Sequence, residues 1–125
     1  MTKIEQIVYF TVAVKDQDEA LRWYTETLGF KKRADLKGPG MRWLTVSPED
    51  QPGLEIVLAS WYPESVGKNL PVGLRTGDCQ KTYEVLRDKG VAFSQAPQEK
   101  PYGLEAVFKD LYGNTYAVRQ LIRGT

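Results

Sequence analysis

Hydrophobic and polar positions in the first half of the chain predict one helix among four strands. Residues 7–14 are rich in β-branched and aromatic types, which is typical of a strand. Residues 16–28 place apolar side chains at helical spacing, with Asp16 as the N-cap and Gly29 as the stop. The other three predicted strands are 30–36, 41–46 and 54–59.

The same order of elements recurs after a predicted connecting loop at 60–70. Asp78, which lies 62 positions after Asp16, is the second predicted N-cap, and Gly90 ends that helix. Two prolines predict a loop over 96–103. The predicted strands of this half are 72–76, 91–94, 105–109 and 115–122. The pattern therefore favours a repeated strand–helix–strand–strand–strand unit over the alternative, an unrepeated α+β domain.

Length and charge narrow the class of protein. A chain of 125 residues has room for one domain, and its 17 basic and 16 acidic residues give a net charge of +1. This balance argues against a nucleic-acid partner. No apolar run approaches the roughly 18 residues of a membrane helix, and the start of the chain has an acid where a signal peptide would become apolar. We therefore expect a cytoplasmic protein without a membrane partner.

The most restrictive feature of the composition is the absence of histidine. The chain has no histidine and a single cysteine, Cys79. Histidine-based triads, two- and three-histidine metal sites, cysteine-cluster metal sites and an intrachain disulfide are therefore excluded. Cys79 follows an acidic residue at a predicted helix start and is interpreted as a small packing residue. The kinds of functional site that remain are one based on carboxylate chemistry and a ligand-binding pocket.

Two motifs carry a resemblance to a known family. Residues 14–24, with the helix end at 28–30, resemble the first helix of the glyoxalase, bleomycin-resistance and extradiol-dioxygenase group, the vicinal oxygen chelate superfamily. Residues 101–110, followed by Gly113 and Asn114, are similar to that family's closing strand–turn–strand. The two motifs lie in different halves, so the resemblance covers the whole chain.

This resemblance implies an α+β fold of two tandem βαβββ modules that form a curled mixed sheet around a cavity. The single domain would cover 1–125, with one module at about 1–62 and the other at about 70–125. It also implies a homodimer.

The resemblance further assigns four metal-ligand positions, and this chain retains one ligand type among them. The positions hold Tyr9, Glu55, Pro71 or its neighbour Val72, and Ala117. A divalent ion needs several donors to replace its water, and proline and alanine offer none from their side chains. We therefore expect no metal and no cofactor.

Strand alternation from the resembled positions predicts the cavity lining, because side chains two apart share a face. On this basis Trp43 is preferred to its neighbours on the third strand, and Tyr102 lies in a loop that could cover the cavity. The predicted ligand-binding residues are Tyr9, Thr11, Trp43, Glu55, Arg75, Tyr102, Glu105 and Arg119. Flat aromatic surfaces and two arginines favour an aromatic or anionic small molecule. Alternatively, Arg75 and Arg119 pair internally with the two glutamates and only fill the old metal site.

The function that these features favour is metal-free binding or sequestration of a small molecule, of the resistance type. The alternative is a lyase- or dioxygenase-type enzyme of the same superfamily, either metal-independent or with a divergent metal site. In that case Glu55 is the candidate catalytic residue, and Glu105 is a second candidate general base.

Overall fold

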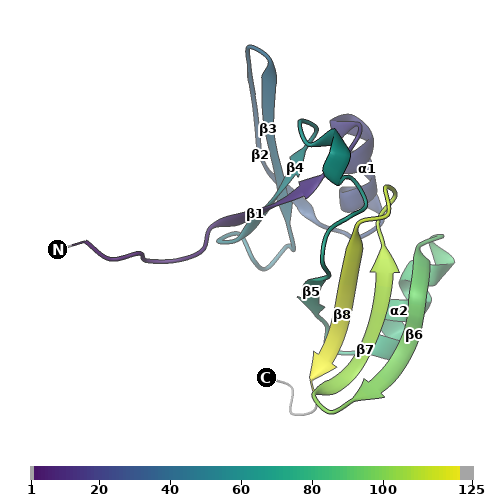
Figure 1. Ribbon diagram of the computed structural model, residues 1–125. Coiled ribbons are helices and arrows are strands. Elements are labelled where there is room, and N and C mark those ends of the chain that lie inside the picture. The colour runs from purple at the N-terminus through teal and green to yellow at the C-terminus, as the bar shows by residue number, and fades with distance from the viewer. Residues whose placement is uncertain (1, 122–125) are drawn as a thin grey trace. The chain divides into compact units, whose positions relative to one another are not determined.

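The computed structural model describes residues 2–121 and divides the chain into two compact units, 1–63 and 64–125 (Figure 1). Each unit has its own four-stranded sheet and its own helix. No helix within the described residues has the length and apolar character needed to cross a membrane.

The first unit consists of four strands and one helix. Its elements are β1 (Tyr9–Ala13), α1 (Gln17–Glu26), β2 (Lys31–Gly38), β3 (Met41–Ser47) and β4 (Glu55–Ala59). The strand order in the sheet is β1-β4-β3-β2, where β1 runs parallel to β4 and the other neighbours are antiparallel. The parallel pair is possible because α1 and two further strands separate β1 from β4 in the chain.

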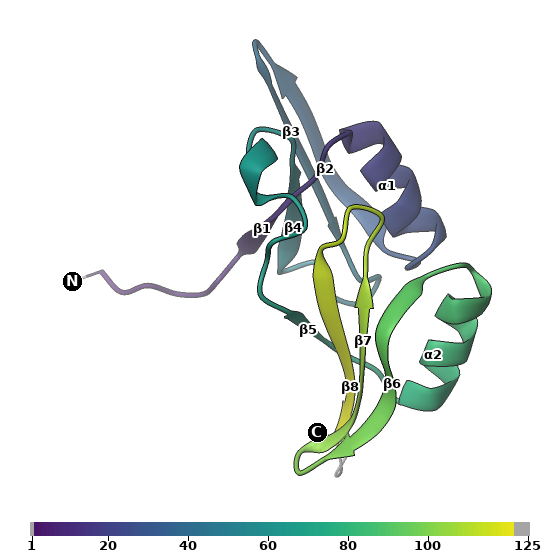
Figure 2. The same cartoon turned by 45° about the vertical axis from the view of Figure 1, so that its right-hand side comes forward.

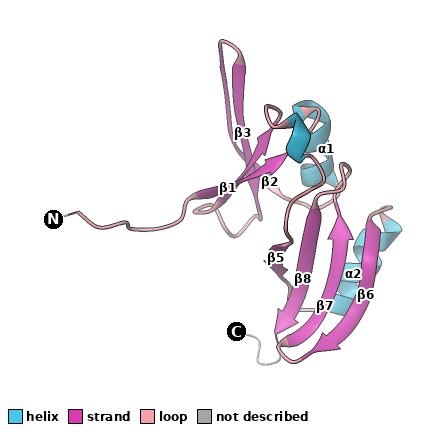
Figure 3. Ribbon diagram, viewed as in Figure 1, coloured by secondary structure: helices cyan, strands magenta, loops and turns pink. Residues whose placement is uncertain are grey.

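The second unit repeats this arrangement. A short 3-10 turn at Pro63–Ser65 precedes β5 (Val72–Arg75), α2 (Cys79–Asp88), β6 (Ala92–Lys100), β7 (Gly103–Lys109) and β8 (Thr115–Leu121). The strand order is β5-β8-β7-β6, again with one parallel pair, β5 with β8. The predicted βαβββ order is confirmed in both halves, as the strands and helices in Figure 3 show.

Both helices begin where the sequence predicts. The Asp16 carboxylate accepts a hydrogen bond from the Glu19 backbone N–H at 2.9 Å, and Asp78 accepts one from the Lys81 N–H at 3.0 Å. Each acid thus satisfies an N–H group that the first helical turn leaves free. Helix α1 ends at Glu26, and its connection to β2 contains the predicted left-handed glycine, Gly29, at φ +75°.

Alternate strand residues form a separate core in each unit, between the sheet and its helix. In the first unit Leu44 of β3 and Leu58 of β4 are fully buried, as is Tyr24 of α1. In the second unit the rings of Phe108 and Tyr116 stack with their centres 5.4 Å apart. Phe108 also contacts Phe93, whose ring meets Tyr83 of α2, so this is the sheet face that α2 covers. Figure 2 shows α2 against the sheet of this unit. The opposite faces of the two sheets are thereby left to carry polar and aromatic side chains.

The predicted loop at 96–103 is wrong, because β6 continues through it to Lys100. β6 is an edge strand, where the missing N–H of Pro97 need not remove a ladder hydrogen bond. The pairing with β7 is irregular between Phe93 and Gln95 and again between Gln95 and Gln98, which places the proline at a bulge. The turn between the strands is shorter than predicted and ends at Gly103.

Candidate functional site

One group of predicted site residues lies on the sheet of the first unit. Tyr9 on β1 is the register partner of Glu55 on β4, so both side chains leave the same face. The Thr45 hydroxyl donates a hydrogen bond to Glu55 Oε1 at 2.5 Å. The rings of Tyr9 and Trp43 meet edge to face with their centres 5.2 Å apart. We call these four residues the aromatic–carboxylate cluster.

On the opposite face of the same sheet, ion pairs of Arg42 join strand β3 to helix α1 and to strand β2, in addition to the apolar packing. Arg42, next to Trp43 in β3, donates to Asp18 of α1 at 2.7 Å and to Asp35 of β2 at 2.8 Å. The hydrogen bond from Arg42 lowers the pKa of Asp35 to about 2, and the same contacts raise the pKa of Arg42. Because Arg42 faces α1, strand alternation directs Trp43 to the other side. Thr11, the register partner of Val57, is exposed on β1.

A second group lies on the sheet of the second unit, where three predicted residues contact one another. Arg119 Nη2 donates to Glu105 Oε2 at 3.0 Å, and the two residues are register partners on β8 and β7. The Tyr102 hydroxyl donates to the other oxygen of Glu105 at 3.3 Å. The Arg119 guanidinium carbon lies 4.2 Å from the centre of the Tyr102 ring. We call these three residues the Arg119 cluster.

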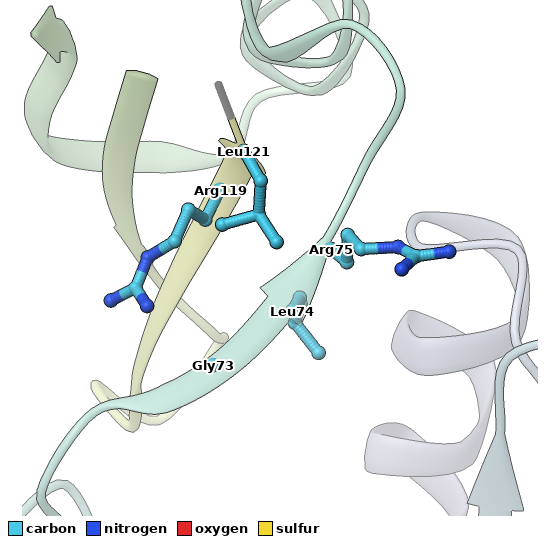
Figure 4. A pocket seen from close by; sticks show the side chains of 5 residues that line it. All are labelled: Gly73, Leu74, Arg75, Arg119 and Leu121. Atoms are coloured by element: carbon cyan, nitrogen blue, oxygen red, sulfur yellow. The ribbon is translucent and has the colours of Figure 1, made fainter. Parts of the chain in front are cut away.

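A cavity of about 220 Å³ lies between the ends of β5 and β8 in the second unit (Figure 4). The residues that line it are Gly73, Leu74, Arg75, Arg119 and Leu121. Arg75 and Arg119 are register partners in the parallel pair. A Cβ built on Gly73 would meet no atom within 4 Å, so the hollow extends to the backbone there.

The structure separates the predicted site residues by unit. Tyr9, Thr11, Trp43 and Glu55 belong to the first unit, and Arg75, Tyr102, Glu105 and Arg119 belong to the second. The internal pairing considered as the alternative is present for Arg119 with Glu105, whereas Arg75 forms no side-chain hydrogen bond or ion pair with the described residues of its own unit, 64–121.

Two side chains that line the cavity, those of Leu74 and Leu121, were missed in the sequence. Leu121 could have been found by extending the alternation of β8 by one step from Arg119. Leu74 could not, because alternation assigns it to the face opposite Arg75. It reaches the hollow only because the cavity opens at the end of a short edge strand.

The side chains at the resembled metal positions do not fit a divalent ion. In the first unit the only carboxylate at such a position, Glu55, is accompanied by the phenol of Tyr9. In the second unit Ala117 is the register partner of Gly73, so neither strand offers a side-chain donor there. Among residues 2–121 no three acidic, cysteine or histidine side chains are grouped closely enough to hold a metal ion. A hard cation needs more oxygen donors than the side chains at these positions supply.

The single cysteine is a packing residue. Cys79 is fully buried at the start of α2, and burial raises the pKa of its thiol. Its backbone N–H donates to the Gln120 side chain at 2.8 Å, which ties the start of α2 to β8. A protonated, inaccessible thiol is a poor nucleophile.

The repeated βαβββ units, each with a helix on one sheet face and polar groups on the other, define an α+β protein of the glyoxalase-like class. The chain belongs to the Glyoxalase/Bleomycin resistance protein/Dioxygenase superfamily, whose family model matches residues 6–118.

Similar proteins are known from sequence and from crystal structures. An uncharacterized protein of Bacillus subtilis, YurT, is 38% identical over 92% of this chain and 98% of its own length. UcmS2, whose crystal structure is known, has 37% sequence identity to this chain and a TM-score of 0.84. The alignment covers 94% of this chain and 98% of that one. TnmS3, described as an antibiotic binding protein from Streptomyces sp. CB03234, is 34% identical with a TM-score of 0.88, over 97% of this chain and 99% of that one.

Proposed function

We propose that this protein binds and sequesters a small molecule without a metal ion, as a resistance-type member of its superfamily. Two similarities support the proposal. The chain belongs to a superfamily that includes bleomycin resistance proteins, and one structural neighbour, TnmS3, is described as an antibiotic binding protein.

The observation that carries the proposal is the chemistry of the two sheet faces. The resembled metal positions hold tyrosine, proline and alanine beside one glutamate, so the side chains present are suited to contact an organic ligand. In the first unit an edge-to-face aromatic pair provides apolar surface next to a hydrogen-bonded carboxylate. In the second unit two arginines and two leucines line a hollow. Mostly apolar walls with a few placed polar groups are the usual composition of ligand sites.

The proposal also covers the chemical class of the ligand, the oligomeric state of the protein, its cellular location and its partners. Aromatic surfaces and arginines favour an aromatic or anionic small molecule. We also infer a homodimer that acts in the cytoplasm and has no nucleic-acid or membrane partner. A net charge of +1 supports the absence of electrostatic partners of that kind. Sedimentation velocity at several protein concentrations tests the dimer.

The binding proposal can be tested by titration calorimetry against a panel of polycyclic aromatic antibiotics and aromatic acids. We expect binding that is unchanged in excess EDTA and ligand that is recovered chemically intact. Conversion of the ligand to product, or binding that is lost with EDTA and restored by a divalent ion, would contradict the proposal.

A pair of variants sharpens this test. Tyr9→Ala removes one ring of the aromatic–carboxylate cluster from a side chain that is already 48% exposed, so the fold should tolerate the change. Tyr62→Ala is the matched control, because Tyr62 is 45% exposed and lies outside the cluster. We expect Tyr9→Ala to weaken binding about tenfold, since stacking on an aromatic side chain is worth ~1 kcal/mol or more. Equal effects of the two variants would remove this cluster from the site.

A further inference from the structure

Strand β1 lies at an open edge of the first unit's sheet. In this sheet β1 pairs only with β4, and the other edge is β2. Strand β2 carries four basic residues, Lys31, Lys32, Arg33 and Lys37, and charged side chains on an edge strand discourage pairing with another chain. Strand β1 carries no charged residue. Within this unit, β1 is therefore the edge that can accept a further strand.

Backbone hydrogen bonds show which residues of β1 point toward this edge. The Val8 carbonyl accepts a hydrogen bond from β4 at 3.0 Å, and the Val14 N–H donates one to β4 at 2.9 Å. Even-numbered residues thus direct their backbone groups toward β4. Because the backbone groups of successive strand residues point to opposite sides, Tyr9 and Thr11 direct theirs toward the edge. A further strand would pair with these N–H and C=O groups.

The segment before β1 has the properties of a strand without a sheet, and we call its residues 2–7 the arm. In Figures 1 and 2 the arm runs away from the sheet of its unit in an extended course. All of its residues are exposed, and its two isoleucines, Ile4 and Ile7, are 95% and 79% exposed. Isoleucine is common in strands and is usually buried. The arm therefore has apolar side chains to bury, next to an edge that has backbone groups to pair.

We propose that the arm pairs antiparallel with β1 of a second copy of this chain, while the partner's arm pairs with β1 of the first copy. The two-fold axis passes through Val8, so that arm residues 3–7 lie opposite the five residues of β1, 9–13. Each copy supplies the same surface, as a two-fold dimer requires. The inference rests on the homodimer proposed above and identifies its interface.

The apolar pattern favours this register over its neighbour. With the axis at Val8, Ile7 lies opposite the partner's Tyr9 and Val8 lies opposite itself, so the exposed apolar side chains come together. A β-branched residue opposite an aromatic one is a favourable cross-strand pair. An axis at Ile7 would instead place the charged Glu5 opposite Tyr9. The register at Val8 also pairs odd-numbered residues with odd-numbered ones, as the backbone groups of Tyr9 and Thr11 require.

The second copy would also contribute to the candidate site. Tyr9 leaves the same sheet face as Glu55 and contacts Trp43 in the aromatic–carboxylate cluster. Side chains of residues directly opposite each other in a sheet share a face. The partner's Ile7, opposite Tyr9, would therefore add an apolar side chain beside this cluster.

Cysteine cross-linking tests the interface directly. Opposite residues of a non-hydrogen-bonded antiparallel pair have Cα atoms about 4.5 Å apart, which a disulfide can bridge. Val8→Cys should therefore give a disulfide-linked dimer under mild oxidation, measured by non-reducing electrophoresis. Met41→Cys is the matched control and should stay unlinked, because Met41 is 46% exposed, close to the 49% of Val8, but lies on β3. The native Cys79 is buried, so the wild type should also stay unlinked.

Proline substitutions test the backbone pairing. Glu5→Pro removes an N–H that faces the partner, whereas Gln6→Pro, the matched control, removes one that faces away. Both residues are exposed, so each variant should fold, which circular dichroism checks. By symmetry Glu5→Pro removes two hydrogen bonds from the dimer, so we expect its dissociation constant in sedimentation equilibrium to rise about tenfold or more. Gln6→Pro should change it by less than about threefold, as should Glu5→Gln, which removes only the charge.

The possible results separate this interface from the dimer and from ligand binding. A dimer that forms equally well without residues 2–7, or that gives no Val8→Cys cross-link, uses another surface and overturns the inference alone. A wild-type chain that stays monomeric at high micromolar concentration overturns both the inference and the proposed homodimer, and leaves β1 to the chain's own second unit or to solvent. Binding of the antibiotic panel is measured on the wild type by calorimetry, so its failure is recognised independently of the oligomeric state.

Discussion

The ion pair between Arg119 and Glu105 gives the most direct test of how the second unit is held together. The change is Arg119→Met, which keeps an unbranched apolar stem and removes the guanidinium. It leaves the Glu105 carboxylate, with its side chain 10% exposed, with the Tyr102 hydroxyl as its remaining hydrogen-bond donor among the described residues. A buried carboxylate that loses a charged donor keeps its desolvation cost without compensation.

The expected loss follows from the exposure of the two partners. Truncating one member of a fully buried ion pair costs about 3–5 kcal/mol, whereas exposed pairs are worth at most about 1 kcal/mol. The Arg119 side chain is 40% exposed, so water screens part of the interaction. The cation–π contact with Tyr102 adds about 0.5 kcal/mol at a partly exposed site. We therefore expect a decrease of about 2 kcal/mol in the free energy of unfolding.

The measurement is urea denaturation followed by far-UV circular dichroism, with tryptophan fluorescence recorded in parallel. All three tryptophans lie in the first unit, so fluorescence alone would not report on the second. Arg87→Met on α2 is the control, because Arg87 is an exposed arginine that also lies over a tyrosine ring and near an aspartate. If both variants lose the same stability, the reasoning about the buried carboxylate is refuted. The double variant with Glu105→Gln should lose less than the sum of the single losses.

Three further predictions concern the N-cap of α2, the turn at Gly103 and the dependence of stability on pH. Asp78→Ala should lower the free energy of unfolding by about 1 kcal/mol in urea denaturation because it removes the N-cap of α2; a change below about 0.3 kcal/mol would contradict that role. Gly103→Ala should destabilise by about 2 kcal/mol or more in the same assay, since Gly103 has φ +140° and an added Cβ would collide with a backbone carbonyl oxygen of β8; unchanged stability would mean that this turn is differently built. The lowered pKa of Asp35, about 2 beside Arg42, stabilises the fold above about pH 4, and this contribution should be lost as the pH falls to about 2. Wild type and Asp35→Asn should therefore converge in melting temperature between about pH 4 and about pH 2, and a constant difference would exclude the linkage.

Much of the fold could be predicted because its signals are local. Asp16 and Asp78 cap helices at their own first turns, and alternation in β3 correctly assigned Arg42 and Trp43 to opposite faces. The segment around Pro97 could not be predicted, because whether proline is tolerated depends on the strand lying at a sheet edge. Whether a strand lies at an edge or in the centre of a sheet is decided only when all the strands pair, so the local sequence does not show it.

For the candidate site too, part could be predicted from the sequence and part required the tertiary structure. The sequence by itself determined which residue types are available: no histidine, one cysteine, and a tyrosine, a proline and an alanine at resembled metal positions. These residue types narrow the chemistry on their own, because a side chain without a donor atom cannot bind a metal in any fold. Only the tertiary structure decided that Arg119 is paired with Glu105, while Arg75 has no partner among the described residues of the same unit, 64–121. Alternation assigns a side chain to a face, but its partners are brought to it by strand pairing between distant segments, which fixes where the charge of this face is left uncompensated.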